Sequence, residues 1–98
     1  MFERWLSLTQ NLGQEGSEGG TIVHDDELPG IGRVTIERET NLETGLDYFG
    51  VTIGVYGLLV HTAFFSSLED TLEGMKIAKI LIQVLVGTTA NDGTPRHG

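Results

Sequence analysis

Four consecutive residues, His24-Asp25-Asp26-Glu27, place one imidazole and three carboxylates just before the turn residues Pro29-Gly30. Hard cations prefer such oxygen ligands, and side chains of one parity share a face of a strand. His24 with Asp26, or Asp25 with Glu27, are therefore candidate metal ligands. The structural interpretation is favoured, because a metal site needs several converging ligands, whereas acids beside a turn are solvated and protect an edge strand.

A second candidate group surrounds His61, which lies in an otherwise apolar stretch. A two-residue hairpin turn at Tyr56-Gly57 would set His61 opposite Thr52, with Tyr48 farther along the same sheet face. Tyr48, Thr52, Tyr56 and His61 could then bind a ligand or partner, or His61 could act as a general base. The structural alternative is a water-facing His61 hydrogen-bonded to Thr52, and it is favoured because no motif supplies a catalytic partner.

Linear catalytic motifs are absent from the sequence. It contains no Gly-x-x-x-x-Gly-Lys loop, no Gly-x-Ser-x-Gly elbow, no His-Glu-x-x-His pair and no calcium-loop pattern. Cysteine is also absent, which excludes disulfides, thiolate metal sites and a cysteine nucleophile. We therefore expect a non-enzymatic protein without a cofactor. The alternative is a small enzyme or divalent-metal protein that uses His24, Asp26 and His61.

Charge and hydropathy narrow the choice of partner. Fourteen acidic and six basic residues give a net charge of -8, which repels nucleic acids and favours protein partners or a second copy of the chain. No apolar run reaches the 18 residues of a membrane helix, and the first five residues lack the layout of a signal peptide. The expected location is the cytoplasm, without a membrane contact.

Alternating residues predict the strands that would position these groups. Residues 21–25 and 33–39 flank a Pro-Gly turn, and their alternation points Val34 and Ile36 to a core and Glu37 to water or a partner. Residues 46–55 and 58–65 form a second predicted hairpin, with Val51 and its same-parity neighbours on one apolar face. A two-residue turn would pair Val55 with Leu58, Ile53 with Val60 and Val51 with Thr62.

A helix is predicted over residues 67–86, with candidate N-caps at Ser66 and Ser67 and a C-cap at Gly87. Its core stripe is expected to contain Leu68, Leu72, Met75, Ile82 and Leu85. Four more apolar residues fall outside that stripe: Ile77, Ile80, Leu81 and Val84. They need another cover, which could be the N-terminal segment or a second copy, unless this region is a strand instead.

The ends of the chain complete the predicted organisation. Phe2, Trp5, Leu6 and Leu12 approximate helical spacing, so residues 1–13 are expected to form a short docking helix, with Phe2 and Trp5 as core staples or interface anchors. Residues 14–20 contain no apolar side chain and are typical of a flexible linker. Residues 21–87 would form the core domain, and residues 88–98 a mobile tail.

These patterns together predict one α+β domain. We expect an antiparallel sheet of about four strands in meander order, with one long C-terminal helix packed on one face and a short N-terminal helix. The expected function is that of a small, acidic interaction module that self-associates through its apolar helix surface.

Overall fold

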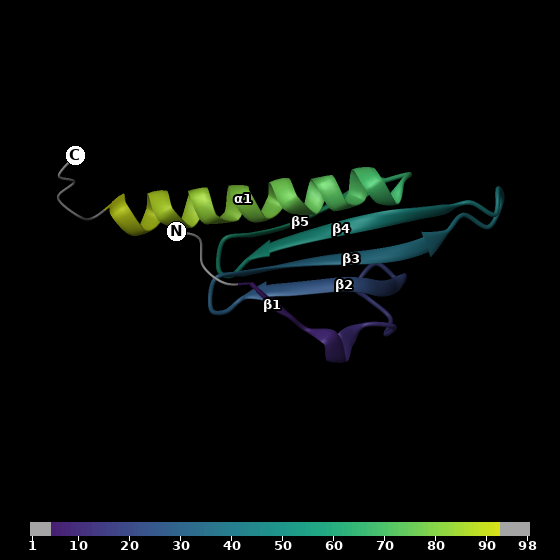
Figure 1. Cartoon of the computed structure of the whole chain (residues 1–98), viewed down its shortest axis with the longest axis horizontal. Helices are drawn as coiled ribbons and strands as arrows, with labels where there is room; N and C mark the ends of the chain where they lie inside the picture. Colours follow the sequence, from purple (N-terminus) through teal and green to yellow (C-terminus); the bar gives the residue numbers. More distant parts are fainter. Residues whose placement is uncertain (1–4, 93–98) are drawn as a thin grey trace.

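The computed structural model describes residues 5–92, with side chains described over residues 5–85. These residues form a five-stranded antiparallel sheet in the order β1-β2-β3-β4-β5, and one helix covers one face of it (Figure 1). The elements are β1 (Leu6–Ser7), the 3-10 turn η1 (Thr9–Asn11), β2 (Thr21–Leu28), β3 (Gly32–Thr40), β4 (Asp47–Val55), β5 (Leu59–Phe65) and α1 (Leu68–Asp92). The predicted α+β class, meander order and C-terminal helix are confirmed.

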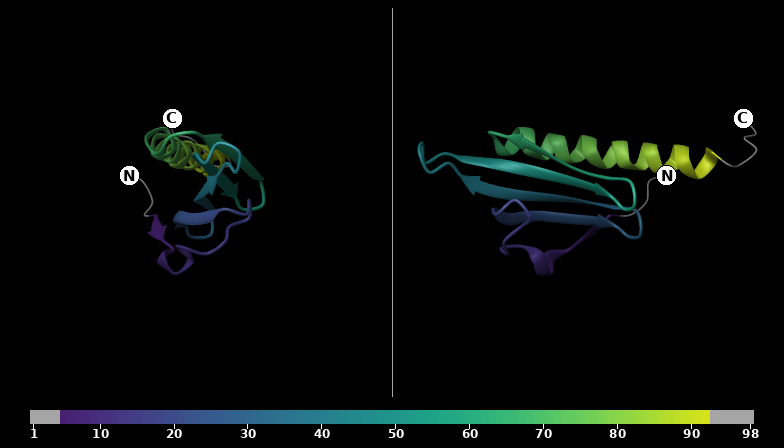
Figure 2. Two further views of the ribbon diagram at one scale, coloured as in Figure 1. Left: turned by 90° about the vertical axis from the view of Figure 1, so that its right-hand side faces the viewer. Right: turned by 180° about the vertical axis from the view of Figure 1, so that it is seen from behind.

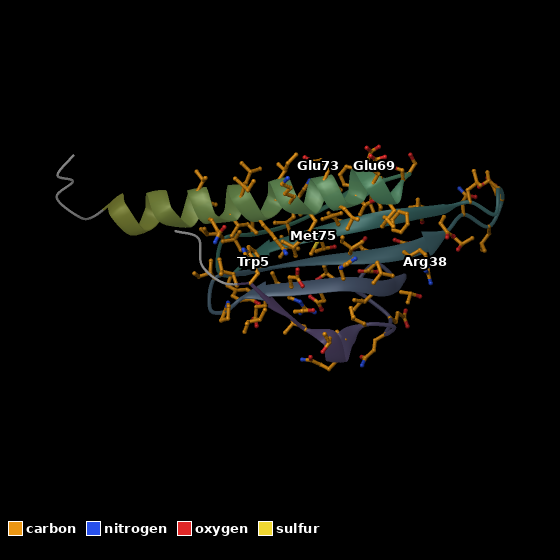
Figure 3. All side chains as sticks on the ribbon, in the orientation of Figure 1. Trp5, Arg38, Glu69, Glu73 and Met75 are labelled. Carbon is orange, nitrogen blue, oxygen red and sulfur yellow. The ribbon has the colours of Figure 1, made fainter. Side chains whose placement is uncertain are left out.

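The core lies between α1 and one face of the sheet, which we call the helix face. Val34, Ile36 and Val51 are buried there, as predicted. They pack with Leu28 and Val55 of the sheet and with Met75, Ala78 and Ile82 of α1. Met75 points from α1 toward the sheet, whereas Glu69 and Glu73 lie on the outer side of the helix (Figure 3). The opposite face, which α1 does not cover, is called the open face.

The buried side of α1 differs from the predicted stripe. Thr71 is buried with Met75, Ala78 and Ile82, whereas Leu68, Leu72 and Leu85 are exposed. The buried residues follow each other at steps of four, three and four, which places them on one side of the helix. Gly74 lies close to Phe65, and an added Cβ would lie 2.8 Å from the Phe65 ring, so a larger residue there would require the ring to shift.

The ends of α1 also differ in part from the prediction. The Ser67 hydroxyl accepts a hydrogen bond from the Asp70 amide at 3.1 Å, so the predicted N-cap is confirmed. The predicted end at residue 86 is wrong, because α1 continues through Gly87 to Asp92. A glycine inside a helix costs only about 1 kcal/mol, which does not terminate it. Residues 88–92 of the predicted tail are therefore helical, and residues 93–98 lie outside the described residues.

The predicted N-terminal docking helix is wrong for residues 5–13. Leu6–Ser7 form a strand that pairs with β2, and Thr9–Asn11 form a 3-10 turn. The Leu8 amide donates to the Asp25 carbonyl at 2.7 Å, and the Gly13 amide donates to the Ile22 carbonyl at 2.8 Å. These hydrogen bonds occupy backbone groups on the outer edge of β2. Pairing with β2 therefore stabilises the N-terminal segment more than folding into a short, isolated helix would.

The predicted linker, residues 14–20, is an ordered loop. The Ile22 amide donates to the Gln14 carbonyl at 2.8 Å, and the Gly16 amide donates to the Gly20 carbonyl at 2.9 Å. The Glu37 carboxylate accepts hydrogen bonds from the Glu18 amide at 3.2 Å and the Gly20 amide at 2.9 Å. Glu37 is consequently buried under this loop, and the prediction that it faces water is wrong.

The β4–β5 hairpin differs by one residue from the predicted register. Val55 pairs with Leu59, and Val51 pairs with Ala63, so the turn has three residues instead of two. The Leu58 amide donates to the Val55 carbonyl at 2.9 Å, and Gly57 supplies the positive φ of 79° that this turn requires. Because side chains alternate between faces, this one-residue difference moves every side chain of β5 to the face opposite the predicted one.

The molecule is elongated, with extents of 56 × 24 × 22 Å. Its radius of gyration is 15.2 Å, whereas about 13 Å is typical of a compact domain of this length. The last turns of α1 extend beyond the end of the sheet (Figure 1). Within residues 5–92, no helix combines the length and apolar content that a bilayer span requires.

Candidate functional site

The candidate metal ligands do not come together. His24 and Asp26 lie on β2, and the Asp26 carboxylate accepts a hydrogen bond from Lys79 Nζ at 2.5 Å. Lys79 Nζ also lies 5.2 Å from the centre of the Trp5 ring, so these contacts tie α1 to β2 and to the N-terminal segment. His61 is on β5, with two strands between it and β2. Over the described residues, no three His, Asp or Glu side chains form a group that could hold a metal ion.

Trp5 serves as a core staple, because it packs against the buried cluster from the N-terminal side. Phe2, the other predicted anchor, lies outside the described residues. His24 is exposed and faces the same side of the sheet as α1.

A buried carboxylate lies on the open face, and the sequence indicated it only as a candidate metal ligand. Asp25 is fully buried. It accepts hydrogen bonds from Arg33 Nε at 2.7 Å, from Arg33 Nη2, from Asn11 Nδ2 at 2.9 Å and from Thr35 Oγ1 at 3.1 Å. Burial by itself raises the pKa of Asp25, but the hydrogen bonds and the charge of Arg33 outweigh it and lower the pKa below its ordinary value. The sequence indicated one part of this network: Arg33 and Thr35 are two residues apart on β3, so their side chains lie on the same face of the strand.

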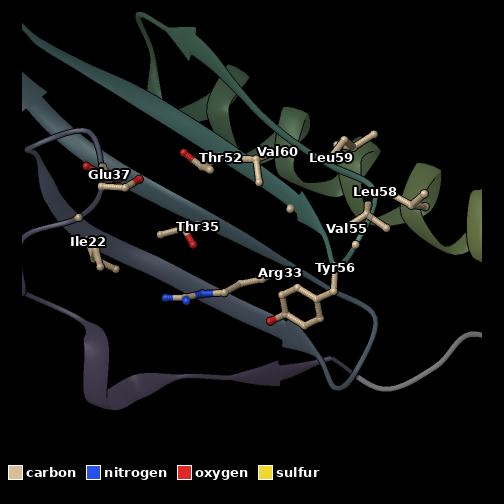
Figure 4. A pocket seen from close by; sticks show the side chains of 14 residues that line it. Ile22, Arg33, Thr35, Glu37, Thr52, Val55, Tyr56, Leu58, Leu59 and Val60 are labelled. Carbon is tan, nitrogen blue, oxygen red and sulfur yellow. The ribbon is translucent and has the colours of Figure 1, made fainter.

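A groove of about 520 Å³ lies on the open face between the 14–20 loop and the β4–β5 turn (Figure 4). Its polar lining includes Arg33, Thr35 and Thr52, and its apolar side includes Val60. Gly54 contributes no side chain to the floor, and an added Cβ there would meet nothing closer than 4.0 Å. The volume is within the range of small-molecule sites.

Two of the four predicted sheet-face residues line this groove. Thr52 shares a hydrogen bond of 2.9 Å with Thr62, and the Tyr56 hydroxyl donates to Glu27 at 2.6 Å. This bond is the main reason that the pKa of Tyr56 is raised. Tyr48 lies outside the groove, where its hydroxyl donates to Glu39 at 3.1 Å. His61 lies on the helix face opposite Ile53, so the predicted His61–Thr52 pair is wrong.

An apolar stripe remains exposed on α1. Ile77, Ile80, Leu81 and Val84 are between 43% and 60% exposed, and we call them the α1 stripe. The sequence correctly placed them outside the core on a helix. Of the described N-terminal residues, β1 and η1 do not cover them, because both lie at the far edge of the sheet (Figure 2). A groove of about 480 Å³ between α1 and the sheet is lined by Ile77, Leu81, Ile53 and Phe65, so these two residues of the stripe face the β5 side. Asp70 and Glu73 of α1 line the same groove.

The outer edge of β5 is exposed beside this stripe. β5 ends the sheet, and none of the described residues pairs with its outer side. The strand carries no charged residue, and Val60 on its open face is 78% exposed. Leu59 and Phe64 are also exposed, so apolar side chains flank the strand on both faces. We call residues 59–65, with their unpaired outer backbone, the β5 edge.

Most polar groups of the open face already bond within the chain, as Asp25 and Glu37 show. No protein-family model, curated protein or solved structure matches this chain. Within the part of the chain that the structure describes, the candidate binding surfaces include the α1 stripe, the β5 edge and the open-face groove.

Proposed function

We propose that the protein is a non-enzymatic interaction module that binds a second copy of itself through the α1 stripe and the neighbouring β5 edge. The exposure of the α1 stripe supports this most directly. Counting about 100 Å² for a fully exposed aliphatic side chain, the stripe and the exposed residues of β5 present roughly 400 Å² of apolar surface. A patch of this size is about the largest that a typical soluble monomer exposes, and such patches are often functional.

The charge distribution supports association at this surface. The chain carries a net charge of -8, so two copies repel each other over most of their surfaces. Neither the α1 stripe nor the β5 edge contains an acidic residue, and the groove between them contains two, Asp70 and Glu73. A second copy that contacts the stripe and β5 therefore meets few acidic residues. We also propose the cytoplasm as its compartment, since a cysteine-free chain needs no oxidising environment. An enzyme or metal protein based on His24, Asp26 and His61 is not proposed, because these residues lie on separate strands or bond elsewhere.

Replacing Leu81 by glutamate tests the self-association. We expect the natural chain to be a dimer at micromolar concentration in sedimentation velocity, and Leu81→Glu to raise the dissociation constant by about 100-fold or more. Leu81 is 60% exposed, so its replacement leaves the melting temperature of the monomer nearly unchanged. Leu42→Glu is the matched control, because Leu42 is 95% exposed in a distant loop. A natural chain that sediments as a monomer at 100 micromolar (roughly the upper end of weak association) would contradict the proposal.

A second candidate function is binding of a small, largely apolar acid in the open-face groove. The groove favours it, because apolar walls surround the partly exposed guanidinium of Arg33. Titration with benzoate should shift the amide NMR signals of Thr52, Gly54 and Tyr56. Gly54→Leu fills the floor of the groove and should abolish these shifts. The same change at another glycine, Gly45, cannot serve as the control, because Gly45 has a positive φ that leucine rarely adopts. Leu46→Ala, at an exposed loop position, should leave them unchanged. Equal shifts in the natural and Gly54→Leu proteins would exclude this site.

A further inference from the structure

We propose that the second copy binds by antiparallel pairing of β5 with β5, so that two five-stranded sheets join into one continuous sheet with both α1 helices on the same face. This inference rests on the proposed self-association and specifies its geometry. It follows from the difference between the two sheet edges, from the symmetry of a strand pair and from the position of the α1 stripe.

The two edges of the sheet differ in how well their backbone groups are covered. At the β2 edge, the N-terminal segment supplies β1 and several backbone hydrogen bonds, and β2 contains a register shift between Ile22 and His24. Bulges, charges and short covering strands are the usual means of preventing edge-to-edge pairing. The β5 edge has seven residues in regular register with β4 and has none of these features. It therefore retains the backbone donors and acceptors that another strand needs.

Symmetry restricts how two β5 strands can pair. Two identical antiparallel neighbours are related by a two-fold axis perpendicular to the sheet, which keeps each side chain on its own face. One position therefore lies opposite its own copy, and the smallest possible change of register moves this position by one residue. The register centred on Thr62 pairs all seven residues of the strand. It also sets Val60 opposite Phe64 of the second copy, and aromatic with β-branched pairs stabilise sheets.

The same axis brings the two α1 stripes toward each other. Each helix packs on β3 and β4 and reaches β5, with Ile77 and Leu81 on its β5 side. If each helix lies above β4, three strand spacings separate the two axes by roughly 14 Å. A helix with its side chains is about 10–12 Å across, so the stripes nearly meet above the joined strands. One pairing thus covers the β5 edge and shields the α1 stripe together.

The surface that this pairing would bury approaches what a stable dimer needs. Stable interfaces bury about 800 Å² on each partner, and their apolar share is somewhat more than half. The roughly 400 Å² of apolar surface on the stripe and β5, together with the backbone and the polar side chains Thr62 and His61, approaches this size. The paired strands contain no acidic residue, and the acidic residues nearest to them in the groove beside α1 are Asp70 and Glu73.

Single cysteines test the register, because the chain has no cysteine of its own and any disulfide must join two copies. Cross-linking of Thr62→Cys requires Thr62 to lie opposite its own copy, where the Cα atoms are about 4.5–5.5 Å apart. Val60→Cys is the matched control: Val60 is more exposed, but in this register it faces Phe64 of the second copy and lies too far from its own equivalent. We expect Thr62→Cys to form a covalent dimer at least tenfold faster than Val60→Cys under mild oxidation. His61→Cys should cross-link instead if the register is shifted by one pair.

The outcomes separate this inference from the proposed function. A dimeric natural chain in which neither Thr62→Cys nor His61→Cys cross-links faster than Val60→Cys would overturn the β5 pairing and leave self-association through α1 intact. A natural chain that is monomeric would overturn both.

A lysine at the β5 edge provides a second test that does not depend on oxidation. Val60→Lys introduces a charge on the exposed open face, as natural edge strands often do. We expect it to raise the dimer dissociation constant by about 100-fold, since two valines lose their burial. Leu42→Lys is the control and should not change the constant. An unchanged constant in Val60→Lys, with an unchanged melting temperature, would contradict the pairing.

Discussion

Val51→Asp is expected to abolish the cooperative unfolding transition of this protein. Val51 is 2% exposed and lies in the centre of the sheet, paired with Ile36 on one side and Ala63 on the other, beneath α1. A carboxylate at this position would lose its hydration without gaining a partner, at a cost of about 4–5 kcal/mol or more. Domains of this size have a total stability of about 5–15 kcal/mol, so most of it would be lost.

Circular dichroism during heating and urea titration measure this effect. Leu42→Asp is the control, because Leu42 is almost fully exposed and its replacement should change stability by less than about 0.5 kcal/mol. Ile53→Asp should be less severe than Val51→Asp, because Ile53 is only partly buried and lines the groove beside α1. A normal transition in Val51→Asp would show that this face of the sheet is not the core.

Arg33→Met is expected to have the second largest effect, about 3 kcal/mol of destabilisation at pH 7. Asp25 is fully buried and takes two of its hydrogen bonds from Arg33. Removing one partner of a buried ion pair leaves an uncompensated charge, which typically costs about 3–5 kcal/mol. The expected loss is at the lower end of this range because the Arg33 side chain is 39% exposed and water compensates part of the change. Arg38→Met is the matched control on the same strand, since Arg38 is exposed (Figure 3).

The loss of stability in Arg33→Met should also change with pH in a defined direction. In the natural protein the pKa of Asp25 is lowered, so its contribution to stability is present above the ordinary carboxyl pKa of about 3.9 and is lost as the pH falls through the native value. Without Arg33, burial raises the pKa of Asp25 and opposes its ionisation. The deficit of Arg33→Met relative to the natural chain should therefore shrink as the pH is lowered from about 7 toward about 4. Urea titrations across this range measure it, and a deficit that stays constant would exclude Asp25 as its cause.

The candidate site could be predicted from the sequence only in part. Ile77, Ile80, Leu81 and Val84 were recognised as surplus apolar residues because helical periodicity separates them from a single core stripe. The predicted meander order implies that the last strand ends the sheet, but the sequence does not indicate whether another segment covers its outer side. The Asp25 network was missed for a similar reason: its partners Asn11 and Arg33 come from segments whose pairing the local pattern does not specify.

The length of the β4–β5 turn decides on which face of the sheet each β5 side chain lies. A two-residue turn at Tyr56-Gly57 fits the pattern of hairpins, but the observed turn includes Leu58. The difference of one residue places His61 on the helix face and Thr62 opposite Thr52. Both faces of β5 carry apolar residues, so hydrophobic alternation along this strand does not select one register over the other.

The sequence by itself determined the α+β class, the four long strands, the helix after Ser67 and the surplus of apolar residues on that helix. These features depend on periodicity and capping, which act between residues close in the chain. Only the tertiary structure decided that the first residues complete the β2 edge, that Glu37 and Asp25 are buried, and that β5 and the α1 stripe lie exposed side by side. These features depend on contacts between distant segments, where backbone and side-chain hydrogen bonds outweigh local preference.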